Sequence, residues 1–201
     1  MNKVPEKYDF IISTGSQDRF PKGSQVYLCY GRMTNREMLK RYGFCITNNK
    51  YNNLLIKLKL EVSDPEFKYR YFILKKFFSM SPNEKSGAVE VSSRHFRVYY
   101  QSFNMKVLKF IKILTFNVKQ DEIDCIIETR SLSLEYLSMQ KLQKVYQDFL
   151  SQFPTTLKDD MKILRDPEQL KKLSVRQHAA LTFRTEQKRI LINQINLIQI
   201  I

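Results

Sequence analysis

The spacing of apolar and polar residues predicts strands in the first third of the chain and mainly helices in the rest. Near the start, "YDFIIS" (8–13) and "QVYLCY" (25–30) are apolar runs of β-forming residues, which is typical of buried strands. Apolar and charged residues then alternate in "LLIKLKLEV" (54–62), as in a strand with one face in solvent. We therefore expect residues 1–62 to be rich in β-structure.

A short, well-bounded helix over residues 35–42 interrupts these strands. Thr34 is followed three residues later by a glutamate, which is the spacing of a capping box, and Gly43 stands where a left-handed residue ends a helix. A Tyr-Gly pair stands on each side of the helix. The preceding strand therefore ends at Tyr30 and the helix ends at Tyr42, so both tyrosines are expected on rigid elements.

From about residue 64 the apolar period becomes helical. Asp64 followed by Pro65 is a typical helix start, with a cap and a proline at the first helical position. We expect helices over 67–80, 104–117 and 132–150, with a short strand over 95–100. The helix over 132–150 is expected to be buried through Leu134, Leu137, Leu142, Val145, Tyr146 and Phe149.

Capping signals divide the last fifty residues. Thr156 with Asp159 and Ser174 with Gln177 have capping-box spacing, and Asp166 precedes a proline. The last helix is expected to extend to about residue 199. Its buried face is expected to contain Ala180, Phe183, Ile190, Leu191, Ile195 and Ile198. Its exposed face, which could contribute to a substrate groove, is expected to contain Arg184, Glu186 and Lys188.

The composition fits a protein with a sizeable core. The chain has 201 residues, 43% of them hydrophobic, which suits one domain or two small ones. No stretch approaches the roughly 18 apolar residues that span a bilayer, and the first residues lack the apolar region of a signal peptide. Cys29, Cys45 and Cys125 form no CxxC pair, and only His95 and His178 could join them at a metal. We expect reduced, buried thiols, no metal site, no membrane segment and a cytoplasmic or nuclear location.

The net charge of +14 invites an acidic partner. The basic residues are spread along the whole chain, however, and no nucleic-acid-binding motif is present. We therefore interpret most of them as solvated surface. A basic face that attracts an acidic protein or a nucleic acid is the alternative.

Two segments carry recognisable motifs. "PKGSQVYLCYGRMTNREMLKRYGF" (21–44) has a Lys-Gly turn, an apolar strand ending in Tyr-Gly, a Thr-Asn pair, a short helix and Tyr-Gly-Phe. "FPTTLKDDMKILRDPEQLKKLSVRQHAALTFRTEQKRIL" (153–191) has a Thr-rich helix start, a short helix and an Ala-Leu…Arg…Glu-Lys…Ile-Leu helix. The first resembles the end of the SET domain, and the second the end of the helical substrate-binding domain, in methyltransferases of the Rubisco large-subunit lysine methyltransferase type. The resemblance implies an α+β fold, with a small β-rich remnant of a SET domain over 1–62 and a mainly α-helical substrate-binding domain over 63–201.

The family transfers a methyl group from S-adenosyl-L-methionine to a lysine or histidine nitrogen, so the resemblance implies that cofactor and a protein substrate. A lysine amine with a pKa near 10.4 must first lose its proton, which costs roughly 4 kcal/mol at neutral pH. An apolar channel disfavours the charged form, and a rigid tyrosine hydroxyl can orient the nitrogen. By resemblance, Tyr30 is the catalytic tyrosine beside the transferring methyl, and Tyr42 and Phe44 line the cofactor pocket and lysine channel. Asn35 is expected to fix the helix start.

The sequence also departs from the family pattern. SET enzymes hold the cofactor with a Gly-x-Gly loop and an Asn-His pair, but none of the five glycines here has that spacing and no Asn-His pair occurs. We expect no methyl transfer, and weak or no cofactor binding, by this chain alone, either as a fragment of a longer product or as a truncated relative. Three functions stay open: part of a protein-lysine N-methyltransferase, a non-catalytic protein-binding module, and a nucleic-acid binder whose affinity falls steeply with salt.

Overall fold

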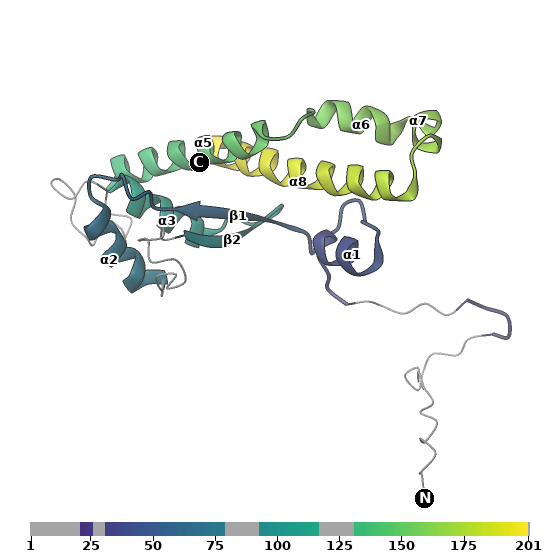
Figure 1. The fold of residues 1–201 in the computed structure, drawn as a ribbon, viewed down its shortest axis with the longest axis horizontal. Coiled ribbons are helices and arrows are strands. Elements are labelled where there is room, and N and C mark those ends of the chain that lie inside the picture. Colours follow the sequence, from purple (N-terminus) through teal and green to yellow (C-terminus); the bar gives the residue numbers. More distant parts are fainter. Residues whose placement is uncertain (1–20, 26–30, 79–92, 117–130, 201) are drawn as a thin grey trace, which may run out of the picture. The chain divides into compact units, whose positions relative to one another are not determined.

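The computed structural model describes residues 21–25, 31–78, 93–116 and 131–200. The chain divides into two compact units, Met1–Gly31 and Arg32–Ile201, and every helix and strand named below belongs to the second. The elements are α1 (Asn35–Tyr42), β1 (Asn53–Lys59), α2 (Phe67–Phe78), β2 (Ser93–Tyr99), α3 (Met105–Thr115), α5 (Leu132–Ser151), α6 (Leu157–Arg165), α7 (Pro167–Lys171) and α8 (Val175–Ile200). Figure 1 shows their order along the chain. Two strands among many helices confirm the α+β fold class.

In the first unit the structure describes the turn before the second predicted strand. The amide of Ser24 donates to the carbonyl of Pro21 at 3.0 Å, and Gly23 has a φ of +89°. A positive φ at the third position of a turn is the conformation that favours glycine. The strands predicted over 8–13 and 25–30 lie outside the described residues.

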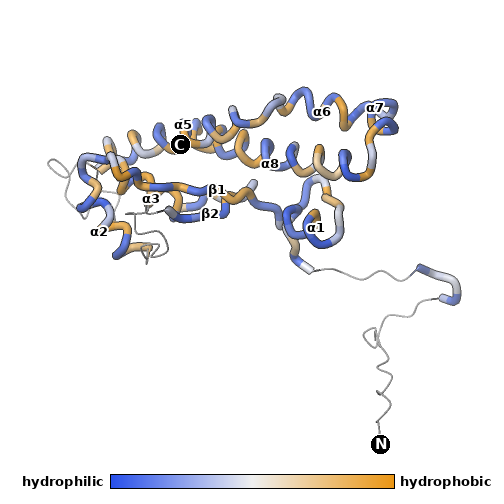
Figure 2. Tube along the Cα trace, viewed as in Figure 1, coloured by the Kyte–Doolittle hydropathy of each residue, from blue (hydrophilic) through white to orange (hydrophobic). Residues whose placement is uncertain are grey.

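The core of the second unit is built on a two-stranded antiparallel sheet. β1 and β2 pair with Ile56 opposite Phe96 and Leu54 opposite Val98. These four side chains lie on the buried face, while Lys57 is exposed, as the alternation in the sequence predicts. α8 packs against β1 and α5, and α5 also packs against α3. The sheet therefore lies against a layer of helices (Figure 1), and Figure 2 shows hydrophobic residues recurring along these elements.

Three phenylalanines join α2, β2 and α3 within this core. Phe78, Phe96 and Phe110 are each at most 5% exposed. Their ring centroids are 5.3 to 5.8 Å apart in edge-to-face arrangements. Burying one such side chain contributes about 1.5–3 kcal/mol, and the edge-to-face geometry adds about 0.5–1.5 kcal/mol per pair.

The helix starts predicted at Thr34, Thr156 and Asp166 are confirmed. Thr34 and Thr156 each form a complete capping box with the acidic residue three positions later, and Asp166 caps α7 ahead of its proline. The start predicted at Asp64 and Pro65 is wrong, because α2 begins at Phe67 and Asp64 instead accepts from the Glu66 amide in the turn before it.

Two predicted core positions are wrong, because Leu137 is 52% exposed and Ala180 is exposed. Each lies next to a buried residue of its helix, Ser138 and Ala179 respectively, but faces solvent.

The predicted exposed face of the C-terminal helix is also wrong. Lys188 is fully buried and Glu186 is 6% exposed, while Arg184 is half-buried. The cause is the position of α8, which contacts α6 as well as α1, β1 and α5. Polar residues on several sides of α8 are therefore enclosed, and they hydrogen bond to the elements that enclose them.

Candidate functional site

Asn35, the first residue of α1, ties that helix to the loop that follows it. Its Nδ2 donates to the carbonyl of Ile46 at 2.9 Å, and its Oδ1 accepts from the Ile46 amide at 3.2 Å. The same Oδ1 accepts from Asn49 Nδ2, and the Asn35 amide donates to Asn52 Oδ1, both at 3.1 Å. Since Asn35 is fully buried, this network fixes α1 and the loop over 44–52 as one piece. The expectation that Asn35 fixes the helix start is in accord with these contacts.

Two of the three predicted site residues form an exposed aromatic pair at the end of α1. The ring centroids of Tyr42 and Phe44 are 6.1 Å apart with an interplanar angle of 31°, and the residues are 42% and 36% exposed. Gly43 between them has a φ of +78° and caps the helix, as predicted. The third residue, Tyr30, lies outside the described residues.

The aromatic pair fits one part of S-adenosylmethionine. Exposed rings offer a flat apolar surface for a purine, and such stacking does not require a particular hydrogen-bond partner. The carboxylate and ammonium groups of the cofactor need charged or hydrogen-bonding partners as well. The Gly-x-Gly loop and Asn-His pair that supply them in SET enzymes have no counterpart in this sequence.

Side-chain amides on one face of α8 hold the start of β1 and the turn after β2. Gln187 Nε2 donates to the carbonyl of Asn53 at 3.3 Å. Gln194 Nε2 donates to the carbonyls of Tyr99 at 2.8 Å and of Ser102 at 3.3 Å. The start of β1 and the turn after β2 are therefore both fixed against α8.

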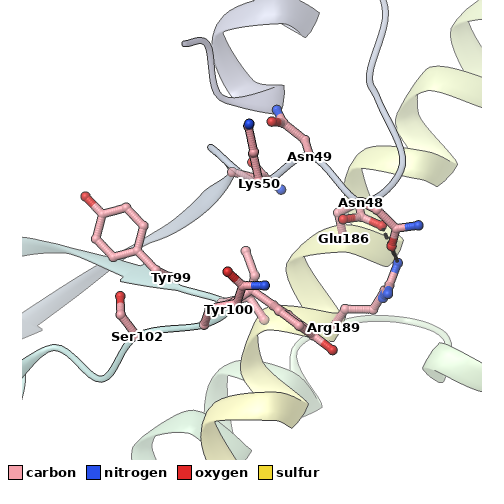
Figure 3. Close-up of a pocket in the computed structure, with 11 residues that line it drawn as sticks. Asn48, Asn49, Lys50, Tyr99, Tyr100, Ser102, Glu186 and Arg189 are labelled. Atoms are coloured by element: carbon pink, nitrogen blue, oxygen red, sulfur yellow. Dashed lines mark hydrogen bonds and ion pairs between the residues drawn. The ribbon is translucent and has the colours of Figure 1, made fainter.

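A pocket of about 390 Å³ lies between these two segments and α8. It is lined by Asn48, Asn49, Lys50, Asn52, Tyr99, Tyr100, Gln101, Ser102, Glu186, Arg189 and Ile190. Figure 3 shows Asn48, Glu186 and Arg189 together on one wall, with Tyr99, Tyr100 and Ser102 contributed by the strand side. The volume is within the usual range for ligand sites.

An ion pair between Glu186 and Arg189 lies in one wall of this pocket. Glu186 accepts a hydrogen bond from Arg189 Nη1 at 2.9 Å, and only 8% of the Glu186 side chain is exposed. Arg189 also donates to Asn48 Oδ1, and its guanidinium carbon lies 5.8 Å from the centroid of the Tyr100 ring. The guanidinium is therefore held by a carboxylate, an amide and an aromatic face at once, which limits its movement.

Asn52 places a buried donor in the same wall. Its Nδ2 has no hydrogen-bond partner in the part of the chain that the structure describes, although its Oδ1 accepts from Asn35. A buried donor left unpaired costs about 1–3 kcal/mol. A bound acceptor group or an ordered water would satisfy it.

The one cysteine among the described residues is not activated. Cys45 is half-buried and free, and its Sγ lies 3.7 Å from the carbonyl oxygen of Asn35. Burial, with a smaller contribution from the Glu186 carboxylate, raises its pKa to about 11. The thiol is therefore protonated at neutral pH. No cluster of metal-ligating side chains occurs in the described ranges.

Over the stretches that the structure describes, no helix is both long and apolar enough to cross a bilayer.

Comparison with known proteins decides the family. Residues 63–191, well over half of the chain, match the family model of the Rubisco LSMT substrate-binding domain. The chain belongs to this family. This match confirms the resemblance seen in the sequence motifs. The matched residues extend from just before α2 into α8.

Two curated relatives are methyltransferases. The chain is 23% identical over 188 residues to an actin-histidine N-methyltransferase of Rattus norvegicus. The aligned residues cover 86% of this chain and 29% of the relative. It is 38% identical over 63 residues to ribosomal lysine N-methyltransferase set11 of Schizosaccharomyces pombe, covering 28% of this chain and 16% of the relative. The chain therefore spans less than a third of the length of either relative.

Solved structures of Rubisco LSMT share the fold. The structure of its SET domain bound to lysine and AdoHcy matches with a TM-score of 0.67 at 17% identity, over 88% of this chain and 40% of that one. The structure of Rubisco LSMT bound to AdoMet matches with a TM-score of 0.66 at 17% identity, over 88% and 41%.

Sequence patterns did not reveal the pocket in this Rubisco LSMT substrate-binding chain. Its lining residues come from three segments more than 40 positions apart. Glu186 was expected on an exposed helix face that could contribute to a substrate groove, and Arg189 was given no role. One signal was available. The C-terminal helix carries Gln187, Gln194 and Lys188 between apolar residues, so polar groups occur on more than one face. A long helix of that kind has polar contacts on more than one face.

Proposed function

We propose that this chain provides the protein-substrate-binding part of an S-adenosylmethionine-dependent protein N-methyltransferase, together with the closing segment of its SET domain. The proposal rests mainly on the pocket between the loop that follows α1, the end of β2 and α8. This pocket lies in a chain of the substrate-binding family. Hydrogen bonds from α8 hold its walls in place.

The chemistry of the pocket suits a peptide. Its lining combines three asparagines, a glutamine and a serine with two tyrosines. Carboxamides donate and accept hydrogen bonds, as the peptide backbone does, and tyrosine rings add apolar contact area. Lys50 and the Arg189–Glu186 ion pair add charge of both signs, so side chains of either charge can be oriented.

The methyl-transfer roles follow from the family resemblance. In this proposal residues 1–62 are the SET segment and residues 63–201 the substrate domain. Tyr30 stands beside the transferring methyl group and orients the substrate nitrogen. Tyr42 and Phe44 pack against the cofactor and the substrate side chain, which agrees with their exposure.

Binding to a protein substrate tests the role of the pocket. The names of the relatives suggest two probes, globular actin and purified ribosomes. We expect the 201-residue chain to bind one of them in a pull-down and in a biolayer assay. Tyr100→Ala should weaken that binding about tenfold, equivalent to about 1.4 kcal/mol, because it removes a ring from the pocket and from the Arg189 guanidinium.

Tyr136→Ala is the matched control, since Tyr136 is 64% exposed on α5 and outside the pocket. Equal loss of binding in both variants, or no loss in Tyr100→Ala, would contradict the pocket's role.

A fusion tests the catalytic role. The N-terminal part of Rubisco LSMT, with its cofactor loop, is joined ahead of residue 1, and transfer of tritiated methyl from S-adenosylmethionine to the bound probe is measured. We expect transfer by the fusion and at least a hundredfold lower rate in its Tyr30→Phe variant, since loss of one positioning contact can cost that much. Undiminished transfer in the variant would exclude Tyr30 as the catalytic tyrosine.

A non-catalytic protein-binding module is the second candidate. It is favoured by the missing Gly-x-Gly and Asn-His motifs, and it requires the same pocket. A fusion that folds and binds the probe but transfers no methyl group would support this function over the first.

A further inference from the structure

A second surface lies along α6, away from the pocket described above. Two open hollows of about 460 Å³ and 620 Å³ share Thr156, Leu157 and Ile192 in their walls. They therefore form one continuous groove, here called the α6 groove. It runs from the end of α5 along α6, with α8 contributing Ile192, and Figure 1 shows α6 lying beside α8.

The floor of the α6 groove is apolar. It consists of Leu150, Phe153, Pro154, Leu157, Met161 and Ile192. Leu157 and Met161 are four residues apart, so they lie on the same face of α6. Both are only half-buried, so part of this apolar face lies in solvent.

The adjacent face of α6 anchors the helix and leaves this apolar face open. Asp160 is fully buried and pairs with Lys188 of α8 at 2.6 Å, with a second hydrogen bond from Arg184 Nε at 3.0 Å. These contacts fix α6 on α8 through a polar residue. The helix cannot turn its apolar face inward without breaking a buried ion pair, which costs about 3–5 kcal/mol.

Basic residues border the groove. Lys158, Lys162 and Arg165 are exposed and line its outer edge. Their spacing of four and three residues places them on one side of α6. None of them forms an ion pair with a carboxylate in the described ranges. The acidic residue nearby, Asp159, is hydrogen bonded to Thr156 in the helix cap.

We infer that the α6 groove binds an acidic amphipathic helix of a partner protein, with its apolar stripe on the floor and its carboxylates against the basic edge. Nucleic acid fits less well, since phosphates gain nothing from the apolar floor. A second copy of the chain would bring two molecules of charge +14 together. From Leu157 to Arg165 the groove follows roughly 12 Å of helix, which matches about two turns of a bound helix. This site is separate from the proposed substrate pocket.

Designed peptides test the inference on the full chain. The probe is an 18-residue helical peptide with leucine at positions i, i+3, i+4 and i+7 and glutamate at most others. A second peptide has the same residues shuffled so that leucines surround the helix, and a third has lysine for glutamate. A thymidine 18-mer represents nucleic acid. Affinities are measured by fluorescence anisotropy at 50 mM and 300 mM salt.

We expect the amphipathic acidic peptide to bind at least tenfold more tightly than the other three probes, with weaker binding at the higher salt concentration. Met161→Asp should weaken binding at least tenfold, and Lys158→Glu with Lys162→Glu should do the same without disturbing the apolar floor. Lys144→Glu on the exposed face of α5 is the matched control and should reduce it less than twofold. Circular dichroism checks that each variant is folded.

Four results would overturn the inference. Equal binding of the shuffled peptide would mean that charge alone attracts it, and tighter binding of the oligonucleotide would assign the surface to nucleic acid. Absence of binding by the amphipathic peptide, or unchanged binding in the folded lysine variant, would also reject the groove as its site. Because the acidic peptide is tested at the α6 groove and not at the substrate pocket, its failure to bind leaves the proposed function unaffected.

Discussion

At the scale of single residues, the buried ion pair of Lys188 and Asp160 explains how α6 and α8 stay together. Lys188 Nζ lies 2.8 Å from Thr155 Oγ1 and 5.3 Å from the centroid of the Phe153 ring, in addition to its contact with Asp160. Burial by itself raises the pKa of Asp160, but hydrogen bonds from Arg184, Lys188 and Thr155 outweigh it and hold that pKa below its ordinary value. The carboxylate is therefore charged and satisfied.

Asp160→Asn should lower the free energy of unfolding at pH 7 by about 3–5 kcal/mol, because it leaves the Lys188 ammonium buried without its counter-charge. The lowered pKa also sets a pH dependence. The stabilisation by the charged Asp160 is fully present above the pKa of an aspartate in the unfolded chain, about 3.9. It is lost as the pH falls through the lower pKa that Asp160 has in the folded chain. Urea unfolding between pH 7 and pH 2.5 measures both effects.

The substitution Asp148→Asn is the control, since Asp148 is exposed on α5. It should change stability by no more than about 0.5 kcal/mol. If the two variants were equally stable, the ion pair would not hold α6 to α8.

At the scale of elements, α1 is the clearest case of local sequence determining local structure. Glu37 accepts from both the Thr34 amide at 2.8 Å and the Thr34 hydroxyl at 2.9 Å. These hydrogen bonds, the backbone one first, lower the pKa of Glu37. The cap positions the helix whose other end carries Tyr42 and Phe44, so it also sets the position of the candidate cofactor surface.

Thr34→Ala should destabilise α1 by about 1 kcal/mol, the usual cost of losing an N-terminal cap. Hydrogen exchange of the α1 amides measures it, and we expect them to exchange about fivefold faster. Thr34→Ser keeps the hydroxyl and should leave the rates close to those of the original chain. Unchanged exchange in Thr34→Ala would show that contacts of Asn35 alone hold the helix.

The elements with strong local signals are those that the sequence predicts well. Capping boxes located α1, α6 and α8, the Asp166-Pro167 pair located α7, and alternation located β1. Burial on the long helices was predicted less well, because it depends on which neighbours surround each face. Leu137 was expected in the core and is exposed, whereas Lys188 was expected on the surface and is enclosed by α6. Neither outcome follows from the spacing of apolar residues along the helix alone.

At the scale of the whole molecule, the chain combines a well-packed substrate-binding fold with an incomplete set of cofactor motifs. The family and cofactor class could be inferred from the motifs around Tyr30 and Tyr42. The pocket could not, because its walls meet only after the loops over residues 48–52 and 99–102 pack together against α8. The domain boundary near residue 62 remains a prediction.

Calorimetric titration of the 201-residue chain with S-adenosylhomocysteine tests how complete the cofactor site is. We expect a dissociation constant weaker than about 1 mM, corresponding to less than about 4.1 kcal/mol of binding, because aromatic packing alone supplies few contacts. Heat from a micromolar complex would instead show that other residues replace the missing loop. Phe44→Ala would then reveal whether the aromatic pair takes part.

Because Lys188 is fully buried, the rate of its chemical labelling measures how often α6 and α8 separate. An amine-acylating reagent at mild pH will tag the surface lysines quickly, whereas the Lys188 nitrogen is fully enclosed and reacts only when α6 separates from α8. Mass spectrometry of that one peptide over time would therefore yield the opening frequency of the helical pair, without any engineered label.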